Sequence, residues 1–329
     1  MGIGAAQSGF RFNIWLSLQH LAFALTSGFS FQHLALRFQK VSLMAHPPAF
    51  SATTRAIVHR TPGQRLGPLT RLMTPGDLGQ RVKPFVFLDL FESIPSTGTG
   101  FRPHPHSGIA TLTTFLEGRM TYGDTTGKQG AMSAGAVEWM RAGSGVWHAG
   151  EPAPDHMMRG YQLWIALPPS LELAPAQSLY LEPERIERDG PARILLGGYG
   201  GATSPIPLPV SITYLHVRLT DGERWIYQPG ADHDTAWLAL NSGKLRVGEA
   251  VLERELAVFA PGNQAIEMTA EGDVELVIGS SAKHPYPLVT GAYSVHTSID
   301  ALAEGERTID QLQHSPAFAA LNRRTALRS

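Results

Sequence analysis

Two histidines separated by one proline, His104-Pro105-His106, are the residues of this sequence best suited to chemistry. At positions i and i+2 of an extended segment, their imidazoles share one face of the strand. The proline between them suits a strand entry or an edge and stiffens the pair. Neutral imidazoles bind divalent metals such as Fe(II), Ni, Cu and Zn. The pair therefore predicts part of a metal site.

A third histidine, His148, follows the glycine-rich segment Gly143-Ser144-Gly145. These glycines permit a tight turn that would bring His148 beside the first pair. Taken singly, each histidine is better explained as a surface or core residue. The three together, at a spacing that fits a barrel hairpin, predict a metal centre of His104, His106 and His148 inside a β-barrel.

The composition narrows the chemistry that such a site could use. The chain has no cysteine, which excludes disulfides, thiolate catalysis and cysteine-bound zinc. Any metal must be held by His, Asp, Glu or backbone oxygen. The net charge is −1 and the isoelectric point about 6.9, so we expect neither direct nucleic-acid binding nor membrane association.

Short strand-like segments separated by glycine-containing turns must position these histidines. The 34 glycines and 24 prolines favour many turns, and the β-branched and aromatic runs between them predict strands. The expected strands of the first half are 82–88, 109–116, 120–122, 137–140 and 161–167. Those of the second half are 214–219, 237–240, 244–247, 256–259 and 274–278. This repetition predicts an all-β fold of two tandem barrels, with a boundary near the prolines of residues 170–195.

One segment near the end of the chain has a helical pattern. Ser298 is a suitable N-cap, and Leu302, Ile309 and Leu312 form an apolar stripe. This spacing predicts a helix over residues 298–312.

Residues 1–43 differ from the rest, because they contain no acidic residue and are rich in Phe and Leu between residues 10 and 38. A secretory signal, a targeting presequence and a translation start assigned too early all account for this composition. The third interpretation makes Met44 the true first residue. No uninterrupted apolar run is long enough to predict a membrane span.

Several segments resemble, in order and spacing, the pirin family, which comprises two-barrel members of the cupin superfamily. The resemblance covers residues 53–312. The matching segments are Pro84-Phe-Val-Phe-Leu-Asp89, Arg102-Pro-His-Pro-His-Ser-Gly108, Thr111-Leu-Thr-Thr-Phe-Leu-Glu-Gly118, Trp139-Met-Arg-Ala-Gly-Ser-Gly145, Val146-Trp-His148, Gln162-Leu-Trp164 and Gly291-Ala-Tyr-Ser-Val-His-Thr297.

The resemblance implies two tandem cupin (jelly-roll) barrels with a short C-terminal helix. We expect residues 1–43 to be an extension outside the family, 44–180 the metal-binding barrel, 181–315 a second barrel without a metal site, and 316–329 a tail. The histidines of the second half do not form an H-x-H pair, and we expect no metal at His216, His233, His284 and His296. For His296 a packing or hydrogen-bonding role is the favoured interpretation.

The resemblance also implies a metal, usually iron, held by three histidines and one glutamate. His104, His106 and His148 match the family pattern, but the position of its glutamate, two residues after the third histidine, is Gly150. Glu151 stands one place further on and would point away from the metal in a regular strand. A bulge at Ala149-Gly150 would turn Glu151 back toward the metal. The alternative is a three-histidine site completed by water, with Asp155 and His156 as weaker substitutes.

For function, the resemblance implies a metal-dependent dioxygenase that cleaves flavonols such as quercetin with O2 and releases CO. The substrate would be a small aromatic compound, and Glu151 would act both as metal ligand and as the base that takes a hydroxyl proton. Trp147, Phe87 and Met140 could line the substrate pocket, although each also fits a plain barrel core. The metal would be Fe(II), with Ni, Cu, Zn and Mn as alternatives.

A second function implied by the resemblance is regulatory and non-enzymatic. In that case the protein would be a redox-responsive, metal-containing partner of a transcription factor or of a metabolic enzyme. A third class is a metal-free barrel with a structural role. In each case we expect a cytoplasmic monomer.

Overall fold

The computed structural model describes residues 54–96, 100–208 and 210–326, and within them the fold is built almost wholly of antiparallel strands. The interpretation of residues 1–43, with Met44 as a start, lies outside the described residues. No helix in the described part of the chain is both long and apolar enough to cross a membrane.

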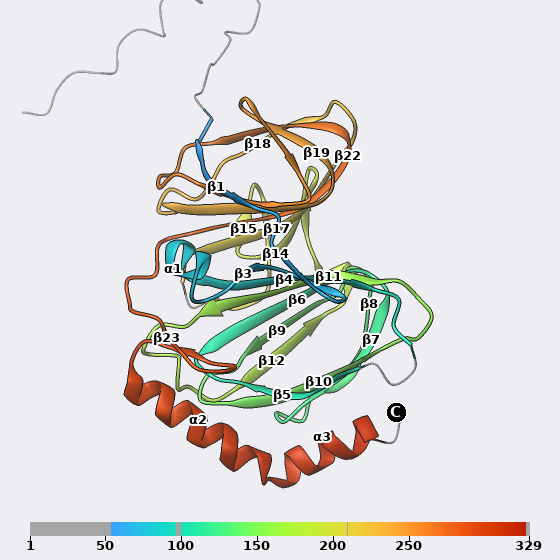
Figure 1. Cartoon of the computed structure of the whole chain (residues 1–329), viewed down its shortest axis with the longest axis vertical. Coiled ribbons are helices and arrows are strands. Elements are labelled where there is room, and N and C mark those ends of the chain that lie inside the picture. The colour runs from blue at the N-terminus through green and yellow to red at the C-terminus, as the bar shows by residue number, and fades with distance from the viewer. Residues whose placement is uncertain (1–53, 97–99, 209, 327–329) are drawn as a thin grey trace, which may run out of the picture. The chain divides into compact units, whose positions relative to one another are not determined.

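The first barrel consists of a larger and a smaller sheet (Figure 1). The larger sheet has the strand order β12-β9-β6-β11-β4-β3-β2, and the smaller sheet the order β5-β10-β7-β8. The larger sheet contains β2 (Gln64–Leu66), β3 (Leu69–Met73), β4 (Phe85–Ser93), β6 (Ile109–Glu117), β9 (Val137–Arg141), β11 (Met158–Ala166) and β12 (Gln177–Leu181). The smaller sheet contains β5 (Phe101–His106), β7 (Arg119–Asp124), β8 (Gln129–Ser133) and β10 (Val146–Pro152). A short helix, α1 (Leu78–Val82), precedes β4, so that strand begins three residues later than expected.

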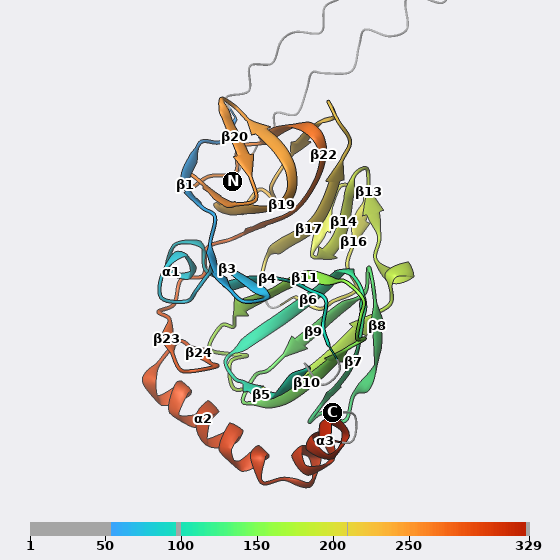
Figure 2. The same cartoon turned by 45° about the vertical axis from the view of Figure 1, so that its right-hand side comes forward.

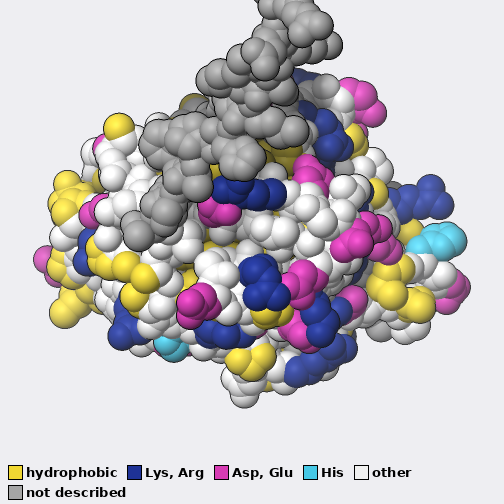
Figure 3. All heavy atoms as spheres, turned by 90° about the horizontal axis from the view of Figure 1, so that it is seen from above, with side chains coloured by type: hydrophobic (Ala, Val, Ile, Leu, Met, Phe, Trp, Pro, Cys, Tyr) yellow, Lys and Arg dark blue, Asp and Glu magenta, His cyan; other side chains and the backbone are white. Residues whose placement is uncertain are grey.

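The second barrel is a single strongly curved sheet with the central order β1-β21-β19-β22-β17-β14-β13 (Figure 2). Two further strands, β18 and β20, pair with β22 and β19. Its strands are β1 (Ile57–Thr61), β13 (Arg188–Asp189), β14 (Ala192–Leu196), β17 (Ile212–Leu219), β18 (Arg224–Tyr227), β19 (Thr235–Val247), β20 (Ala250–Glu253), β21 (Leu256–Phe259) and β22 (Ile266–Ser281). The short elements η1 (Pro183–Arg185), β15 (Gly198–Tyr199) and β16 (Ala202–Thr203) lie in the connections. On the face of the molecule seen in Figure 3, basic and acidic side chains are interspersed rather than separated by sign.

The two tandem cupin barrels expected from the sequence are present, but each barrel includes a segment from the other end of the chain. Strand β1, which we expected in the first barrel, pairs with β21 and covers an edge of the second sheet. Because an uncovered edge exposes unpaired backbone groups, this pairing protects the second sheet. One apolar core spans both barrels, with Phe85 packed edge-on against Trp237 at a ring-centroid distance of 5.4 Å.

After β22 the chain returns to the first barrel. Its last elements are β23 (Val289–Thr290), β24 (Val295–His296), α2 (Ile299–Gln313) and α3 (Pro316–Ala326). The predicted helix is confirmed as α2, and the Ser298 side chain caps it by accepting a hydrogen bond from the backbone N–H of Ala301. Residues 316–326, expected to be part of a tail, instead form α3, which packs against β10 through the edge-on contact of Phe318 with Trp147.

Candidate metal centre

His104, His106 and His148 meet inside the first barrel. Strand β5 carries the first two on one face, and β10 pairs with β5 so that His148 lies directly opposite His104. The ring centroids are 5.1 Å apart for His104 and His106, 4.3 Å for His104 and His148, and 5.1 Å for His106 and His148. One ring nitrogen from each lies within 4.8 Å of the others, a group that could hold a metal ion.

Each of the three rings is held by a partner at Nδ1. The partners are the carbonyl of Arg102 for His104, at 2.9 Å, and the carbonyl of Tyr293 for His106, at 3.1 Å. For His148 the partner is the Glu138 carboxylate, at 3.5 Å. Because a carbonyl or carboxylate can only accept, each Nδ1 carries the proton and each Nε2 presents a lone pair.

Two of the three Nε2 atoms are buried and have no hydrogen-bond partner. His106 Nε2 and His148 Nε2 are both enclosed and make no hydrogen bond. An unpaired buried acceptor is costly, whereas a metal ion bound there would satisfy both atoms. Fixing Nδ1 by a second residue is also how proteins orient metal-binding imidazoles. The donor set therefore fits a divalent metal.

Electrostatics favour the neutral, ligating form of His104 and His106. Burial and the neighbouring His148 lower the pKa of His104 to about 4. Burial, together with His148 and His104, lowers the pKa of His106 well below its usual range. Imidazoles that resist protonation keep their lone pairs available to a metal at neutral pH.

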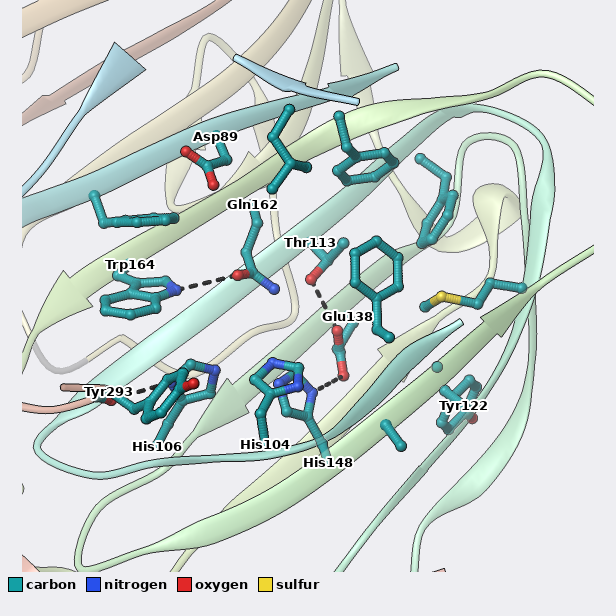
Figure 4. A pocket seen from close by; sticks show the side chains of 18 of the residues that line it. Asp89, His104, His106, Thr113, Tyr122, Glu138, His148, Gln162, Trp164 and Tyr293 are labelled. Carbon is teal, nitrogen blue, oxygen red and sulfur yellow. Dashed lines mark hydrogen bonds and ion pairs between the residues drawn. The ribbon is translucent and has the colours of Figure 1, made fainter. Parts of the chain in front are cut away.

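The three histidines form one wall of a cavity of about 350 Å³ (Figure 4). The other walls are largely aromatic. The Phe87 ring stacks on the Trp164 ring with a centroid distance of 4.2 Å, and Phe91 packs against Phe115. Tyr293 reaches the cavity from the segment between β23 and β24.

A few polar groups interrupt the apolar walls. Arg71 forms an ion pair of 2.9 Å with Asp89, and its guanidinium carbon lies 4.7 Å from the centre of the Phe87 ring. The Gln162 side-chain oxygen accepts a hydrogen bond from the Trp164 indole N–H at 3.2 Å. Such sparse polar groups in an apolar cavity orient a ligand rather than supply most of its binding energy.

Glu138 is a member of the site that the sequence did not reveal. It lies on β9, is 3% exposed and lines the cavity. Thr113 Oγ1 donates to it at 2.8 Å and the Tyr180 hydroxyl at 3.2 Å. Burial alone would raise the pKa of Glu138, but His148, Thr113 and Tyr180 together lower it below its usual value, so the carboxylate is ionised. The sequence signal was weak, because Glu138 stands alone between the apolar residues Val137 and Trp139.

Glu151 is placed away from the three histidines. The expected irregularity is present, since the β10–β5 register shifts between His148 and Gly150. It does not turn Glu151 inward, however, because Glu151 pairs with Thr121 on β7 and borders a separate hollow beside Leu321.

Gly150 lines the histidine cavity, and the space beside it is taken by Met120. A Cβ added at Gly150 would lie 2.5 Å from the Met120 sulfur. The two weaker substitutes, Asp155 and His156, are exposed in the turn after β10 and do not line the cavity. The carboxylate nearest to His148 thus comes from Glu138 rather than from the end of β10.

Of the three pocket residues expected from the sequence, only Phe87 lines the cavity. Trp147 faces the opposite side of β10, where its indole N–H donates to the Ile309 carbonyl of α2 at 3.0 Å. Met140 belongs to the apolar core that packs around Ile109.

The other histidines have different surroundings. His216 contacts Glu275 at 3.0 Å, and His233 contacts Ser280 at 2.7 Å. The hydrogen-bonding role expected for His296 is confirmed, since it contacts Ser107 at 2.9 Å and Glu172 at 3.2 Å. That chain of contacts fastens the segment carrying Tyr293 to the strand end next to His106.

Comparisons with known proteins agree with this architecture. A family model described as Pirin matches residues 68–165. A pirin-like protein of Caulobacter vibrioides is 33% identical over 220 residues, which cover 64% of this chain and 79% of that protein. A Pseudomonas aeruginosa protein named "Putative quercetin 2,3-dioxygenase" is 41% identical over 123 residues, covering 36% of this chain and 43% of its own. The solved quercetin 2,3-dioxygenase from Acinetobacter baumannii is similar in fold, with a TM-score of 0.71, 21% identity, and coverage of 78% of this chain and 97% of that one.

Proposed function

The chain belongs to the pirin family, and from that premise we propose that it is a metal-dependent dioxygenase acting on flavonol-like aromatic substrates. The observation that carries the proposal is the convergence of three imidazoles, each held at Nδ1, on one wall of an aromatic cavity. The name of the Pseudomonas aeruginosa relative supports the same substrate class.

In this proposal His104, His106 and His148 hold the metal through Nε2. We propose Fe(II), with nickel, copper, zinc and manganese as the alternatives that a nitrogen-rich site also accepts. When bound, the ion would act as a Lewis acid toward a substrate hydroxyl and leave coordination positions open. Glu138 orients His148 and adds a negative charge beside the cationic centre.

The cavity walls would bind a planar aromatic substrate. The stacked Phe87–Trp164 pair and the Phe91–Phe115 pair offer flat apolar surfaces. Gln162 and the Arg71–Asp89 ion pair offer hydrogen bonds to the several hydroxyl groups of a flavonol. The cavity volume of about 350 Å³ lies within the range of small-molecule sites.

The proton of the substrate hydroxyl needs an acceptor, and we propose Glu138 for that role in place of Glu151. Glu138 is an ionised carboxylate that lines the cavity, whereas Glu151 borders another hollow. In the overall reaction the flavonol and O2 give an ester and CO, so one ring carbon leaves as CO and the ester retains the remaining atoms.

The direct test is to load metal-free protein with Fe(II) or Ni(II) and to follow quercetin absorbance and CO release under O2. We expect stoichiometric loss of quercetin and formation of CO, abolished in His106→Ala. If the loaded protein leaves quercetin and related flavonols unchanged, the dioxygenase proposal fails. A metal-dependent pull-down of a protein partner without turnover would then support the regulatory alternative.

A further inference from the structure

A second cavity, of about 230 Å³, lies between the barrels and has a basic lining. It is bordered by the turn before β9 on the first barrel and by β13, β14 and β17 on the second. Its basic residues are Arg188, Arg193, Arg218 and His216, and no acidic side chain lines it. It is distinct from the metal cavity, with which it shares only the Phe115 side chain.

Three of these residues stand opposite one another on adjacent strands. Arg188 on β13 pairs with Arg193 on β14, and Arg193 pairs in turn with His216 on β17. Like charges directly opposite each other destabilise a sheet. Arg188 and Arg193 break this rule, and neither forms an ion pair within the described residues, whereas His216 at the end of the row contacts Glu275. An uncompensated arginine pair of this kind points to a functional role.

The nearest acidic residues along the chain do not neutralise this row. Glu187 and Asp189 flank Arg188, and they accept hydrogen bonds from the backbone N–H groups of Thr203 and Gly201. Glu275 contacts Arg218, but it also accepts from Arg159, His216 and Asn241. Its charge is already shared among several donors.

Arg193 is the most deeply buried arginine of this cavity. It is 6% exposed, and its guanidinium donates to the Gly135 carbonyl. Among the described residues no carboxylate lies within ion-pair distance of it. Burial, with the like charges of Arg188 and Arg218, lowers the pKa of Arg193 to about 10. A buried cation without a counter-charge is costly, so a bound anion would relieve this arrangement.

His216 adds a second unsatisfied group. It is 3% exposed, and its Nε2 contacts Glu275, while its Nδ1 is buried without a hydrogen-bond partner. A ligand could satisfy Nδ1 in two ways. A hydroxyl of the ligand could donate a hydrogen bond to it, or, if Nδ1 carries a proton, it could donate to a ligand oxygen.

We propose that this basic cavity binds a small oxyanion, namely a phosphate group, between the two barrels. Guanidinium groups match phosphate oxygens in pairs, and Arg188 and Arg193 lie side by side for such contacts. Its small volume suits inorganic phosphate or the phosphate end of a small phosphomonoester. Nothing in the proposed dioxygenase reaction requires this site, so it is a separate binding function.

The test measures phosphate binding to the metal-free full chain, because phosphate would also bind a metal ion at the histidines. Sodium phosphate, glycerol phosphate and sodium chloride are compared at equal ionic strength by calorimetry and thermal unfolding. We expect saturable binding of at least one phosphate compound and a rise in melting temperature that chloride does not give. Tighter binding of sodium phosphate would identify free phosphate as the ligand, and tighter binding of glycerol phosphate would identify a phosphomonoester.

The variants are chosen to keep the fold intact. Arg188→Gln changes an exposed side chain of the row and should weaken phosphate binding about tenfold. Arg185→Gln removes the same charge from an exposed residue three positions away that does not line the cavity, and should bind as the wild type does. Arg193→Gln should abolish binding where it folds. Phosphate compounds that act no differently from chloride, or equal losses in Arg185→Gln and Arg188→Gln, would overturn the proposal.

Discussion

The Nδ1 atom of His148 lies 3.5 Å from Oε1 of Glu138, and this contact joins the two sheets of the first barrel across its interior. His148 is on β10 of the smaller sheet and Glu138 on β9 of the larger one. The carboxylate of the candidate metal centre thus comes from the opposite wall of the barrel and contacts the site through His148.

Replacing Glu138 by glutamine should weaken metal binding about 10- to 100-fold, because partners that orient a ligating histidine typically contribute that much. The protein should remain folded, since glutamine keeps the volume of the side chain. Competition with a chelator measures the affinity, and the absorption spectrum of the Ni(II) or Co(II) form reports the altered coordination of His148.

The matched control is Glu151→Gln, which removes the same charge three residues beyond His148 on β10. Glu151 borders the hollow beside Leu321 rather than the histidine cavity. The metal affinity and the absorption spectrum of Glu151→Gln should therefore equal those of the wild type. A loss in Glu151→Gln with none in Glu138→Gln would restore the sequence-based assignment of Glu151.

Placing a glutamate at position 150 should tighten metal binding once Met120 is shortened. In the wild type a Cβ at Gly150 would lie 2.5 Å from the Met120 sulfur, so Gly150→Glu alone forces that flexible side chain aside. The double variant Gly150→Glu, Met120→Ala has room for a carboxylate beside His148. We expect it to bind metal at least tenfold more tightly than Met120→Ala alone, measured by chelator competition. An affinity equal to that of Met120→Ala would show that the strand does not direct residue 150 to the metal.

Local sequence patterns were sufficient where the chemistry is local. Two histidines at i and i+2 must share a face of a strand, and Ser298 ahead of an apolar stripe must cap a helix. Both features depend on residues within one element, and both appear in the structure as expected.

Features that depend on tertiary pairing were not predictable in the same way. Glu138 meets His148 only because β9 and β10 face each other across the barrel. Similarly, β1 joins the second sheet through its pairing with β21, nearly two hundred residues away. Helix α3 is stabilised by the contact between Phe318 and Trp147, which no periodicity in residues 316–329 indicated.

His284 should make the protein less stable at acid pH. It is 2% exposed, both ring nitrogens lack partners, and burial together with Lys83 lowers its pKa to about 4, against a smaller opposing influence of Glu172. Because the unfolded histidine titrates near 6.5, the unfolded state binds the extra proton first. Stability from this group is therefore complete above about pH 6.5 and is lost as the pH falls toward 4.

In His284→Leu this loss of stability should be absent. The decrease in the free energy of unfolding from pH 7.5 to pH 4.5 should therefore be smaller than in the wild type by about 1–2 kcal/mol. The measurement is the free energy of unfolding in urea at pH 7.5 and pH 4.5. His156→Leu, at an exposed position, is the control and should keep the wild-type slope. If the free energy of unfolding fell by the same amount between pH 7.5 and pH 4.5 in His284→Leu and in the wild type, His284 would not be the group responsible.

Glu275 should be the main polar link between the barrels. Arg159 of β11 in the first barrel contacts it at 2.6 Å, and Arg218, His216 and Asn241 of the second barrel also donate to it. Burial alone would raise the pKa of Glu275, but His216, Asn241 and Arg218 lower it well below the usual range. Its stabilisation is therefore present above the unfolded pKa of about 4.3 and is lost as the pH falls toward the folded value.

Glu275→Gln should lower the free energy of unfolding by about 3–5 kcal/mol, because it removes the buried carboxylate that pairs with the largely buried Arg159, whose side chain is 15% exposed. Glu117→Gln is the matched control, since Glu117 also pairs with Arg159 but its side chain is 47% exposed; it should cost no more than about 1 kcal/mol. Urea unfolding at pH 7.5 measures both variants. At pH 3 the gap between Glu275→Gln and the wild type should narrow, and a gap that does not change with pH would mean that Glu275 stabilises by packing rather than by charge.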